Sequence, residues 1–222
     1  AELADFLAGL SAVSRPVICD WFRGSEAVEW KPDASPVTRA DKAAETALRA
    51  AIEARFPDDA ILGEEHAARP GSGKTGYSWV IDPIDGTRAF VCGRPVFGTL
   101  VGLVDGTTPV AGLIDMPMLD ECYVGVGGKT VLNGAAATTS QVTSLARARI
   151  ASTAPEALLA DSLAAFNRMV DQAAITVYGG DCHNYALLAA GHLDLVLEDG
   201  LATHDIMGVV EVVRAAGGIV TD

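Results

Sequence analysis

Two aspartates stand three residues apart in the segment WVIDPIDGTRAF, residues 79–90. The Val and Ile before them favour a strand, and Pro83 fixes its own φ angle and lacks an N–H donor, which suits a sharp turn at a strand end. Such a turn can direct the carboxylates of Asp82 and Asp85 to one side. Like charges at contact distance repel unless one is protonated or a cation lies between them. The pair therefore predicts a cation site, although an Asp in such a segment is also a common turn former.

Further carboxylates stand at two other predicted element ends. Glu64 and Glu65 follow a short apolar run in LGEE, and Asp205 lies at a loop-to-helix junction in THDIMG. Carboxylate ligands favour a hard divalent ion, so the set indicates Mg²⁺ rather than Zn²⁺. Two alternatives stay open: Glu65 is a solvated surface side chain, and Thr203 or Asp205 is an ordinary helix N-cap.

Gly86 and Thr87 follow Asp85 directly. They place small residues and free backbone N–H groups at the turn, where a phosphate oxygen could dock. The segment therefore predicts a phosphate beside the cation.

The loop GSGKTG, residues 71–76, matches the letters of a dinucleotide-binding fingerprint and of the end of a P-loop. Both motifs work only where a glycine-rich turn follows a strand and begins a helix, so that N–H groups point at phosphate. Here EEHAARP precedes the loop, a predicted strand follows it, and Ala68 stands where the first P-loop glycine belongs. We therefore expect a solvated loop and no nucleotide site.

Two helices are predicted before these motifs. The first is amphipathic, because apolar residues recur at helical spacing; they are Leu3, Phe6, Leu7, Leu10, Val13, Val17 and Trp21. The second begins at TRAD, where Thr38 and Asp41 match a capping box, and ends at Pro57.

The pattern changes at residue 78 to short runs rich in Val, Ile and Gly, which predict the sheet of a first lobe. These runs are SWVID, FGTLVGLV, TPVAGLID and ECYVGVG. ARIASTA and AITVYGG predict strands of a second lobe, with helices in APEALLADSLAAFNRMVDQ, NYALLAAGH and IMGVVEVVRAAGG. We expect an N-terminal lobe over residues 1–130, with metal-binding motifs, and a C-terminal lobe over residues 131–222, with the last metal ligand and the substrate-side residues.

The composition excludes some classes of protein. A net charge of −13 over 222 residues argues against binding to duplex nucleic acid, which needs clustered Lys and Arg. The four cysteines lack metal-site spacing, which fits a reduced compartment. No apolar run reaches the roughly 20 residues of a membrane span, and the acidic start differs from a signal peptide. We expect a cytoplasmic protein that binds neither membranes nor nucleic acid.

With these segments in place, the chain resembles the inositol monophosphatase superfamily of Mg²⁺-dependent, lithium-sensitive phosphatases. The matching segments lie in family order and cover almost the whole chain; they are KPDASPVTRAD, FPDDAILGEE, WVIDPIDGTRAF, GGDCHNYALLAAGHLDLVLEDG and HDIMGVVEVVRAAGGIVTD. The D-P-x-D-G-T core, together with G-E-E and the late H-D, is highly specific. The resemblance implies a layered αβαβα sandwich of the α/β (α+β) class and hydrolysis of phosphate monoesters.

The resemblance also implies two metal positions. Glu64, Asp82 and the backbone carbonyl of Ile84 would hold one ion, and Asp82, Asp85 and Asp205 would hold a second. The expected cofactor is Mg²⁺, with two or three ions per site and Mn²⁺ as a substitute. A pair of divalent ions would cancel the negative charge that protects a phosphate monoester from attack.

Catalytic and phosphate-binding roles follow from the same resemblance. Thr87, assisted by Asp41, would orient the attacking water near Glu64, while the N–H groups of Gly86 and Thr87 receive the phosphate. Asp41 can take part in this pair and in a capping box at the same time. No serine or cysteine nucleophile is required.

The segments DGTRAFVCGRPVFGTLVGLV and GGDCHNYALLAAGHLDLVLE resemble most closely the histidinol-phosphate phosphatase branch. Asp181 and Glu198 match substrate-side positions, and two carboxylates there would suit the cationic histidinol better than neutral inositol. Asp181 has an alternative role as the cap of a helix beginning near Asn184. His183, Arg88 and Arg94 have no assigned role.

Two other functions stay open beside histidinol-phosphate hydrolysis. One is hydrolysis of inositol phosphate or another small sugar-alcohol phosphate, and the other is metal binding without catalysis. Intact Glu64, Asp82, Asp85, Thr87 and Asp205 argue against the second. The resemblance further implies a homodimer. Relatives usually continue with further strands after the position of GIVTD, and we expect a disordered tail there.

Overall fold

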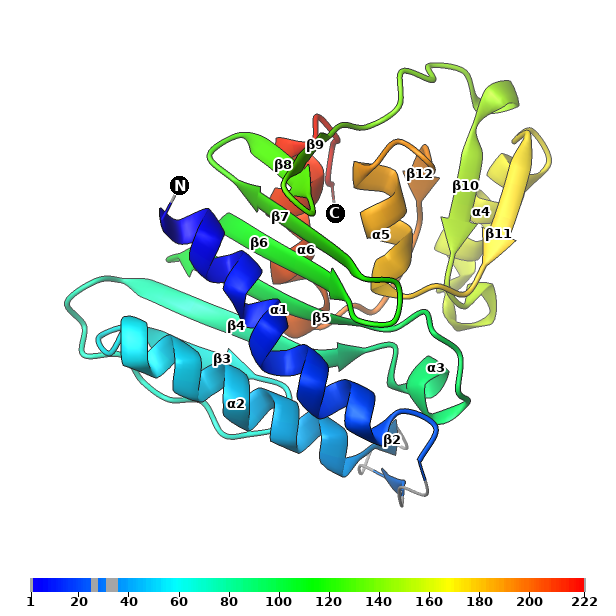
Figure 1. The fold of residues 1–222 in the computed structure, drawn as a ribbon. Coiled ribbons are helices and arrows are strands. Elements are labelled where there is room, and N and C mark those ends of the chain that lie inside the picture. Colours follow the sequence, from blue (N-terminus) through cyan, green and yellow to red (C-terminus); the bar gives the residue numbers. More distant parts are fainter. Residues whose placement is uncertain (1, 25–27, 31–35, 222) are drawn as a thin grey trace.

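The computed structural model of the chain describes residues 2–24, 28–30 and 36–221. Figure 1 shows five layers in order: helices α1 and α2, a seven-stranded sheet, helices α5 and α6, a three-stranded sheet, and α4. The predicted αβαβα sandwich is therefore confirmed. Of the segment KPDASPVTRAD, residues 31–35 lie outside the described part.

The seven-stranded sheet has the order β3-β4-β5-β6-β7-β8-β9, and all its pairs are antiparallel except the parallel pair β3 and β4. Its strands are β3 (Ala60–Gly63), β4 (Tyr77–Asp85), β5 (Gly98–Asp105), β6 (Thr108–Met116), β7 (Glu121–Val126), β8 (Lys129–Leu132) and β9 (Ala135–Ala137). The three-stranded sheet is parallel and consists of β10 (Arg149–Ser152) between β11 (Ile175–Tyr178) and β12 (Leu195–Val196). A separate pair joins β1 (Glu29–Trp30) to β2 (Pro36–Val37).

The helices are α1 (Glu2–Trp21), α2 (Arg39–Arg55), α3 (Thr87–Val91), α4 (Ala160–Val170), α5 (Cys182–Ala189) and α6 (Thr203–Ala215), with short 3-10 turns η1 (Leu145–Arg147) and η2 (Pro155–Ala157). The amphipathic first helix is confirmed, because Leu7, Leu10 and Ile18 are buried against the sheet and α2. The capping box of Thr38 and Asp41 is also present, since each side chain accepts an N–H of the first turn. Helix α2 thus begins where predicted.

A row of glycines lets α6 lie directly on the large sheet. Gly102, Gly112 and Gly125 are cross-strand neighbours on β5, β6 and β7. A Cβ at Gly102 would lie 2.5 Å from the carbonyl oxygen of Met207, and one at Gly112 would lie 2.3 Å from that of Gly208. Any side chain here would push the helix away. The row therefore fixes α6, whose first residues enter the site described next.

The large sheet contains residues from both sides of position 130. Strands β8 and β9 continue the large sheet to Ala137, and the late helix α6 returns to pack on it. The division at residue 130 remains a prediction.

The glycine-rich loop, residues 71–76, lies at the surface. Residues 71–76 are exposed and lead into strand β4, and Lys74 forms an ion pair with Asp58 at 3.0 Å. The solvated loop is thus confirmed. Among the helices in the described ranges, none combines the length and apolar composition needed to cross a bilayer.

Candidate metal centre

The end of β4 turns sharply and presents two carboxylates. The pairing of β4 with β5 shifts register between Asp82 and Asp85, so the strand bulges there. Asp82 Oδ1 accepts the Ile84 N–H at 3.1 Å, and Gly86 adopts a left-handed φ of 84°. The turn-forming interpretation of Asp82 is therefore correct at the local level, and it is compatible with a further role for the other carboxylate oxygen.

The predicted acidic residues converge from the ends of β3 and β4 and the start of α6. One group is Glu64, Asp82 and His204, and a second is Asp82, Asp85 and Asp205; within each group the ligand atoms lie within 4.8 Å of one another. Asp82 belongs to both groups and is only 2% exposed. This set of four carboxylates is called the acidic cluster below.

Burial and mutual repulsion disfavour the charged forms of the cluster. Burial, aided by the charges of Asp85 and Glu64, raises the pKa of Asp82 well above its ordinary value. Burial, aided by the charge of Asp181, raises the pKa of Asp85 to about 7, although hydrogen bonds from Cys182 oppose the shift. Burial and neighbouring carboxylates both favour the protonated form, and such shifts are common at functional sites.

The chemistry of the cluster fits divalent cations. Oxygen donors from three separate elements face a common centre, as required for a hard ion such as Mg²⁺ or Mn²⁺. Added positive charge would remove the repulsion that raises the pKa of Asp82. The backbone carbonyl of Ile84, predicted as a further ligand, accepts a hydrogen bond from Thr87 Oγ1 at 3.0 Å.

Asp205 is the third residue of α6, which begins at Thr203 after Ala202. Neither Thr203 nor Asp205 occupies the N-cap position, so that alternative was wrong. Asp205 Oδ2 instead accepts the backbone N–H of Ala202 at 2.6 Å. This bond fixes the carboxylate at the helix start, where the positive end of the helix dipole favours an anion.

Asp41 and Thr87 meet beside the acidic cluster. The buried Asp41 accepts the Thr38 N–H at 2.8 Å and the Thr38 hydroxyl at 2.6 Å through Oδ2. Its other oxygen, Oδ1, lies 3.4 Å from Thr87 Oγ1. Asp41 is thus both a member of the capping box and the neighbour of the Thr87 hydroxyl.

Gly86 and Thr87 begin the short helix α3. Gly86 is the N-cap and Thr87 the first helical residue, so intrahelical carbonyls cannot accept their N–H groups. Both residues line a cavity of about 620 Å³, together with Glu64, Asp85 and Asp205. An anion bound there would lie against the acidic cluster.

The two predicted substrate-side carboxylates line the same cavity. Glu198 accepts the Thr153 N–H at 2.9 Å and the Thr153 hydroxyl at 2.8 Å. Asp181 is the N-cap of α5, but its side chain makes no capping hydrogen bond, and the helix begins at Cys182 rather than near Asn184. Asp181 thus occupies the N-cap position, as that alternative expected, but its carboxylate does not cap the helix. Burial raises the pKa of both carboxyls.

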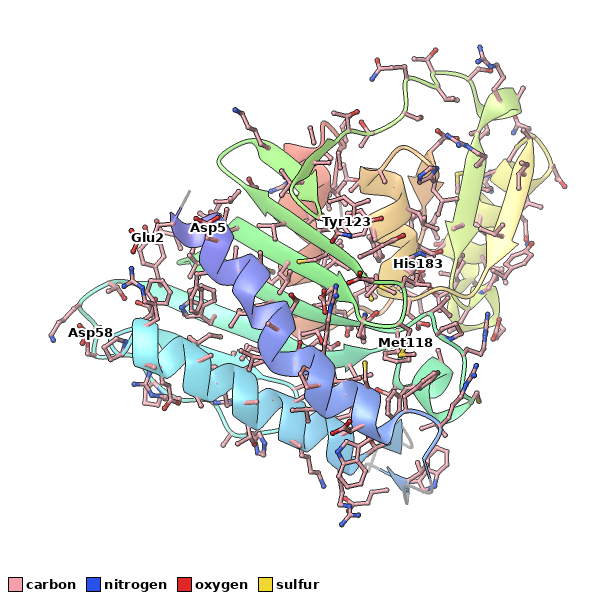
Figure 2. The ribbon with its side chains drawn as sticks, in the orientation of Figure 1. Glu2, Asp5, Asp58, Met118, Tyr123 and His183 are labelled. Carbon is pink, nitrogen blue, oxygen red and sulfur yellow. The ribbon has the colours of Figure 1, made fainter. Side chains whose placement is uncertain are left out.

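The three basic residues without a prior role separate in the structure. Arg88 lines the cavity. The positive charges of Arg94 and Arg88 lower the pKa of Asp181 and so oppose the effect of burial. Both guanidinium groups therefore lie within electrostatic reach of Asp181. His183 lies on α5 (Figure 2) and is not among the residues that line the cavity. Burial lowers the pKa of His183.

Sequence reasoning missed two contributors to the site. His204 Nε2 lies 3.5 Å from Asp205 Oδ1 and 3.8 Å from Glu64 Oε1, although the sequence pattern gave it no role. Its place next to Asp205 in the sequence was the available signal. The backbone N–H of Cys182 donates to Asp85 Oδ2 at 2.6 Å, and no residue type could have indicated that contact.

Comparison with known proteins gives a consistent result. The model of the Inositol monophosphatase family matches residues 1–222. The chloroplastic bifunctional phosphatase IMPL2 of Arabidopsis thaliana is 42% identical over 100% of this chain and 65% of its own length. A histidinol-phosphatase of Chlorobaculum parvum is 36% identical over 91% of this chain and 79% of its own. The chain thus spans less than two thirds of the Arabidopsis protein.

A solved structure of an inositol monophosphatase from Zymomonas mobilis is similar in fold. It has a TM-score of 0.85 and 39% sequence identity, and the match covers 97% of this chain and 83% of that one. The layered fold and the sequence therefore point to the same group of proteins.

Proposed function

The chain belongs to the inositol monophosphatase family, and from this premise we propose that it hydrolyses phosphate monoesters of small alcohols with the help of bound Mg²⁺. The observation that supports the proposal most is the acidic cluster. Its ligand atoms fall into two groups, and the atoms of each group lie within 4.8 Å of one another. Three of its residues line the same cavity as Gly86 and Thr87. Water and the monoester would give the free alcohol and inorganic phosphate, with cleavage of one P–O bond.

The residues of the cluster would divide the binding between them. Glu64, Asp82 and the Ile84 carbonyl would hold one Mg²⁺, and Asp82, Asp85 and Asp205 another; a third ion, or Mn²⁺ in place of Mg²⁺, is compatible with the same donors. Bound divalent ions would neutralise phosphoryl charge and activate water. The N–H groups of Gly86 and Thr87 would receive phosphoryl oxygens at the start of α3.

Thr87 and Asp41 would position the attacking water. The Thr87 hydroxyl has one proton and two acceptors in reach, Ile84 O at 3.0 Å and Asp41 Oδ1 at 3.4 Å. When the proton is donated to Asp41, the Thr87 oxygen is left as an acceptor for a water proton. Because Thr38 holds Asp41 through the other oxygen, the orientation of this pair is fixed before substrate binds.

Histidinol phosphate is the substrate that we favour. The relatives from Chlorobaculum parvum and Mycobacterium tuberculosis are named histidinol-phosphatases. Asp181 and Glu198 add negative charge to the cavity wall, where the ammonium and imidazole of histidinol could form charge-assisted hydrogen bonds. The reaction would produce L-histidinol and phosphate, a step of histidine biosynthesis.

Inositol phosphate, or another small sugar-alcohol phosphate, is the second candidate substrate. Its support is the similarity to the inositol monophosphatase of Zymomonas mobilis, and the guanidinium of Arg88 in the cavity wall, which reduces the net negative charge there. Metal binding without catalysis is the least favoured function, since Thr87 and Asp41 are placed beside the cluster.

A phosphate-release screen tests the proposal. Histidinol phosphate, inositol 1-phosphate and other small monoesters would each be assayed with Mg²⁺, with chelator, and with Ca²⁺ in place of Mg²⁺. We expect release that depends on Mg²⁺, because Ca²⁺ prefers a larger and less regular coordination shell. Release that persists after chelation, or no release from any monoester, would contradict the proposed function.

Asp181→Ala separates the two substrates. The variant should lose most of its kcat/KM on histidinol phosphate while retaining that on inositol 1-phosphate, which serves as the internal control. Unchanged selectivity would rule out the proposed role of Asp181.

The state of the protein in the cell also remains a proposal. We expect a cytoplasmic protein, and a homodimer as the family resemblance implies. Light scattering on the purified chain would report its mass in solution, and a mass equal to the 23.0 kDa of one chain would contradict the dimer.

A further inference from the structure

Glu45, on the buried face of α2, holds the turn that follows β3. Its side chain is fully buried. The carboxylate accepts the Glu65 N–H at 2.7 Å through Oε2, and the His66 N–H at 3.2 Å through Oε1. Arg49, one helical turn later, donates from Nε to Oε1 at 2.7 Å. One buried carboxylate thus satisfies two consecutive backbone donors and one guanidinium.

The same helix holds the turn at three more points. Arg49 donates from a terminal nitrogen to the carbonyl oxygen of His66 at 3.2 Å. The Nε2 atom of His66 lies 3.1 Å from the Lys42 carbonyl and 3.2 Å from the Thr46 hydroxyl. The chain from Glu65 to His66 is therefore fastened to α2 through both backbone and side chain.

Gly63 allows this close approach. A Cβ at Gly63 would lie 2.0 Å from Glu45 Oε1 and 2.3 Å from Cδ. The carboxylate cannot move aside cheaply, because it is buried and bonded to three donors. The end of β3 thus lies against Glu45, one residue before Glu64.

We propose that Glu45 is a positioning residue that holds Glu64 in the acidic cluster, an inference that rests on the proposed function because it assigns Glu64 to a cation. Glu64 lies between Gly63 and Glu65. Gly63 leaves space for the Glu45 carboxylate, and the Glu65 N–H donates to it. Its own N–H donates to Ile81 O at 3.2 Å, which ties it to β4. The backbone of Glu64 is therefore held from both sides.

Helix α2 would then set two parts of the site at once. Asp41 lies four residues before Glu45, so the two side chains share one face of the helix. Asp41 reaches Thr87 from that face, and Glu45 reaches the turn of Glu64. The helix would fix the distance between the water-positioning pair and the metal ligand from β3.

Two substitutions test the role of Glu45 directly. Glu45→Gln keeps the size of the side chain, but its NH₂ group must face one of the donors whose hydrogen bond the carboxylate accepted, so that hydrogen bond is lost. Glu45→Ala removes the acceptor altogether. Partners behind metal ligands typically change affinity by about 10–100-fold, so we expect Mn²⁺ affinity to fall about tenfold in the Gln variant and more in the Ala variant. Binding is measured without substrate, by calorimetry or electron paramagnetic resonance.

Amide hydrogen exchange follows the turn itself and does not depend on any activity. The Glu65 and His66 amides should exchange faster in both variants, with or without metal. Glu53→Gln is the matched control, because Glu53 lies on the same helix, is 44% exposed and forms its ion pair with Arg69, at 3.5 Å. It should leave Mn²⁺ affinity and both exchange rates unchanged.

Gly63→Ala approaches the same contact from the other side. The added methyl would displace the Glu45 carboxylate, and Mn²⁺ affinity should fall about tenfold. In the Glu45→Ala background the methyl would enter the space left by the carboxylate, so the second substitution should add little. Such non-additivity is expected only if the two residues act through one contact. If Glu45→Ala folds poorly, Glu45→Gln and Gly63→Ala still test the contact from its two sides.

The outcomes distinguish this inference from the proposed function. Wild-type Mn²⁺ binding together with unchanged affinity in Glu45→Gln and Gly63→Ala would overturn the role of Glu45 alone. Failure of the wild-type chain to bind Mn²⁺ would overturn the proposed function, and the metal role of Glu45 with it. Weakened binding, faster exchange and non-additivity together would support the assignment.

Discussion

Asp194 and Asp85 are shielded aspartates in two regions with opposite electrostatics. Asp194, just before β12, accepts from Arg149 Nε at 3.0 Å and from the Arg149 N–H at 2.7 Å. These hydrogen bonds lower the pKa of Asp194 to about 2. At the end of β4, burial and the charge of Asp181 raise the pKa of Asp85 to about 7.

The difference separates carboxylates that support the fold from those that can bind a cation. Arg149 gives Asp194 its counter-charge within the chain, and Arg15 does the same for Asp115, to which it donates at 3.1 and 3.0 Å. In the acidic cluster the dominant neighbours of Asp82 are other carboxylates. A group of carboxylates that raise one another's pKa in this way is a candidate for binding an external cation.

Asp82→Asn should have the largest effect. It removes the one carboxylate common to both ligand groups. Substituting a residue that only supports a metal ligand costs up to roughly 100-fold in activity, so Mg²⁺-dependent hydrolysis should fall by more than that here. The metal-free protein should become more stable, because repulsion with Asp85 and Glu64 is relieved. Phosphate release and thermal unfolding in chelator measure the two effects. Loss of activity together with a lower melting temperature of the metal-free protein would contradict the claim that repulsion between these carboxylates destabilises the metal-free cluster.

Asp41→Asn should be next in size and different in kind. The Asn side-chain oxygen can still accept the Thr38 N–H of the capping box, so stability should change little, but Asn cannot accept the Thr87 proton as a carboxylate does. We expect kcat to fall about 10²-fold, within the range for proton-transfer groups, with Mn²⁺ affinity unchanged. A fall in Mn²⁺ affinity equal to that in kcat would place Asp41 among the metal ligands.

The stability of the metal-free protein should depend on pH with a sign set by the cluster. Because the pKa of Asp85 rises from 3.8 to about 7 on folding, the folded state binds more protons than the unfolded state between these values. The contribution to stability is therefore full below pH 3.8 and is lost as the pH rises toward 7. Denaturant unfolding in chelator should show this decline, and saturating Mg²⁺ should reduce it. A free energy of unfolding that increases as the pH rises from 3.8 to 7 would contradict the raised pKa of Asp85.

Asp194→Asn should have the smallest effect on function. It removes the hydrogen-bonded counter-charge of Arg149 and should lower the free energy of unfolding by about 1–3 kcal/mol. Mn²⁺ affinity and kcat should match the wild-type values. The stabilising effect of the wild-type Asp194 carboxylate should depend on pH in the opposite direction to that of Asp85. It should be present above pH 3.8 and be lost as the pH falls toward 2.

Much of the fold could be predicted from periodicity, because the pattern depends on local burial. The stripe of α1, the capping box of α2 and the strand ends at Glu64 and Asp85 required no knowledge of distant contacts. The acidic cluster was predictable because two carboxylates close together at a strand end repel one another unless one is protonated or a cation lies between them.

Other features depend on contacts between distant segments. The start of α5 at Cys182 follows from packing against the β4 turn, where the Cys182 N–H reaches Asp85. The side of α6 that meets the sheet depends on three glycines in three strands. His204 enters the site only because that helix is fixed there. A single sequence gives the residue types of such contacts but not their pairing.

Crystals grown with Mn²⁺ and measured for anomalous scattering test the central claim most directly. We predict anomalous peaks within bonding distance of the Asp82 carboxylate, one shared with Glu64 and one with Asp85 and Asp205, and no peak at Asp194. A cluster without bound Mn²⁺, with its carboxylates turned away from one another at saturating metal, would contradict the account.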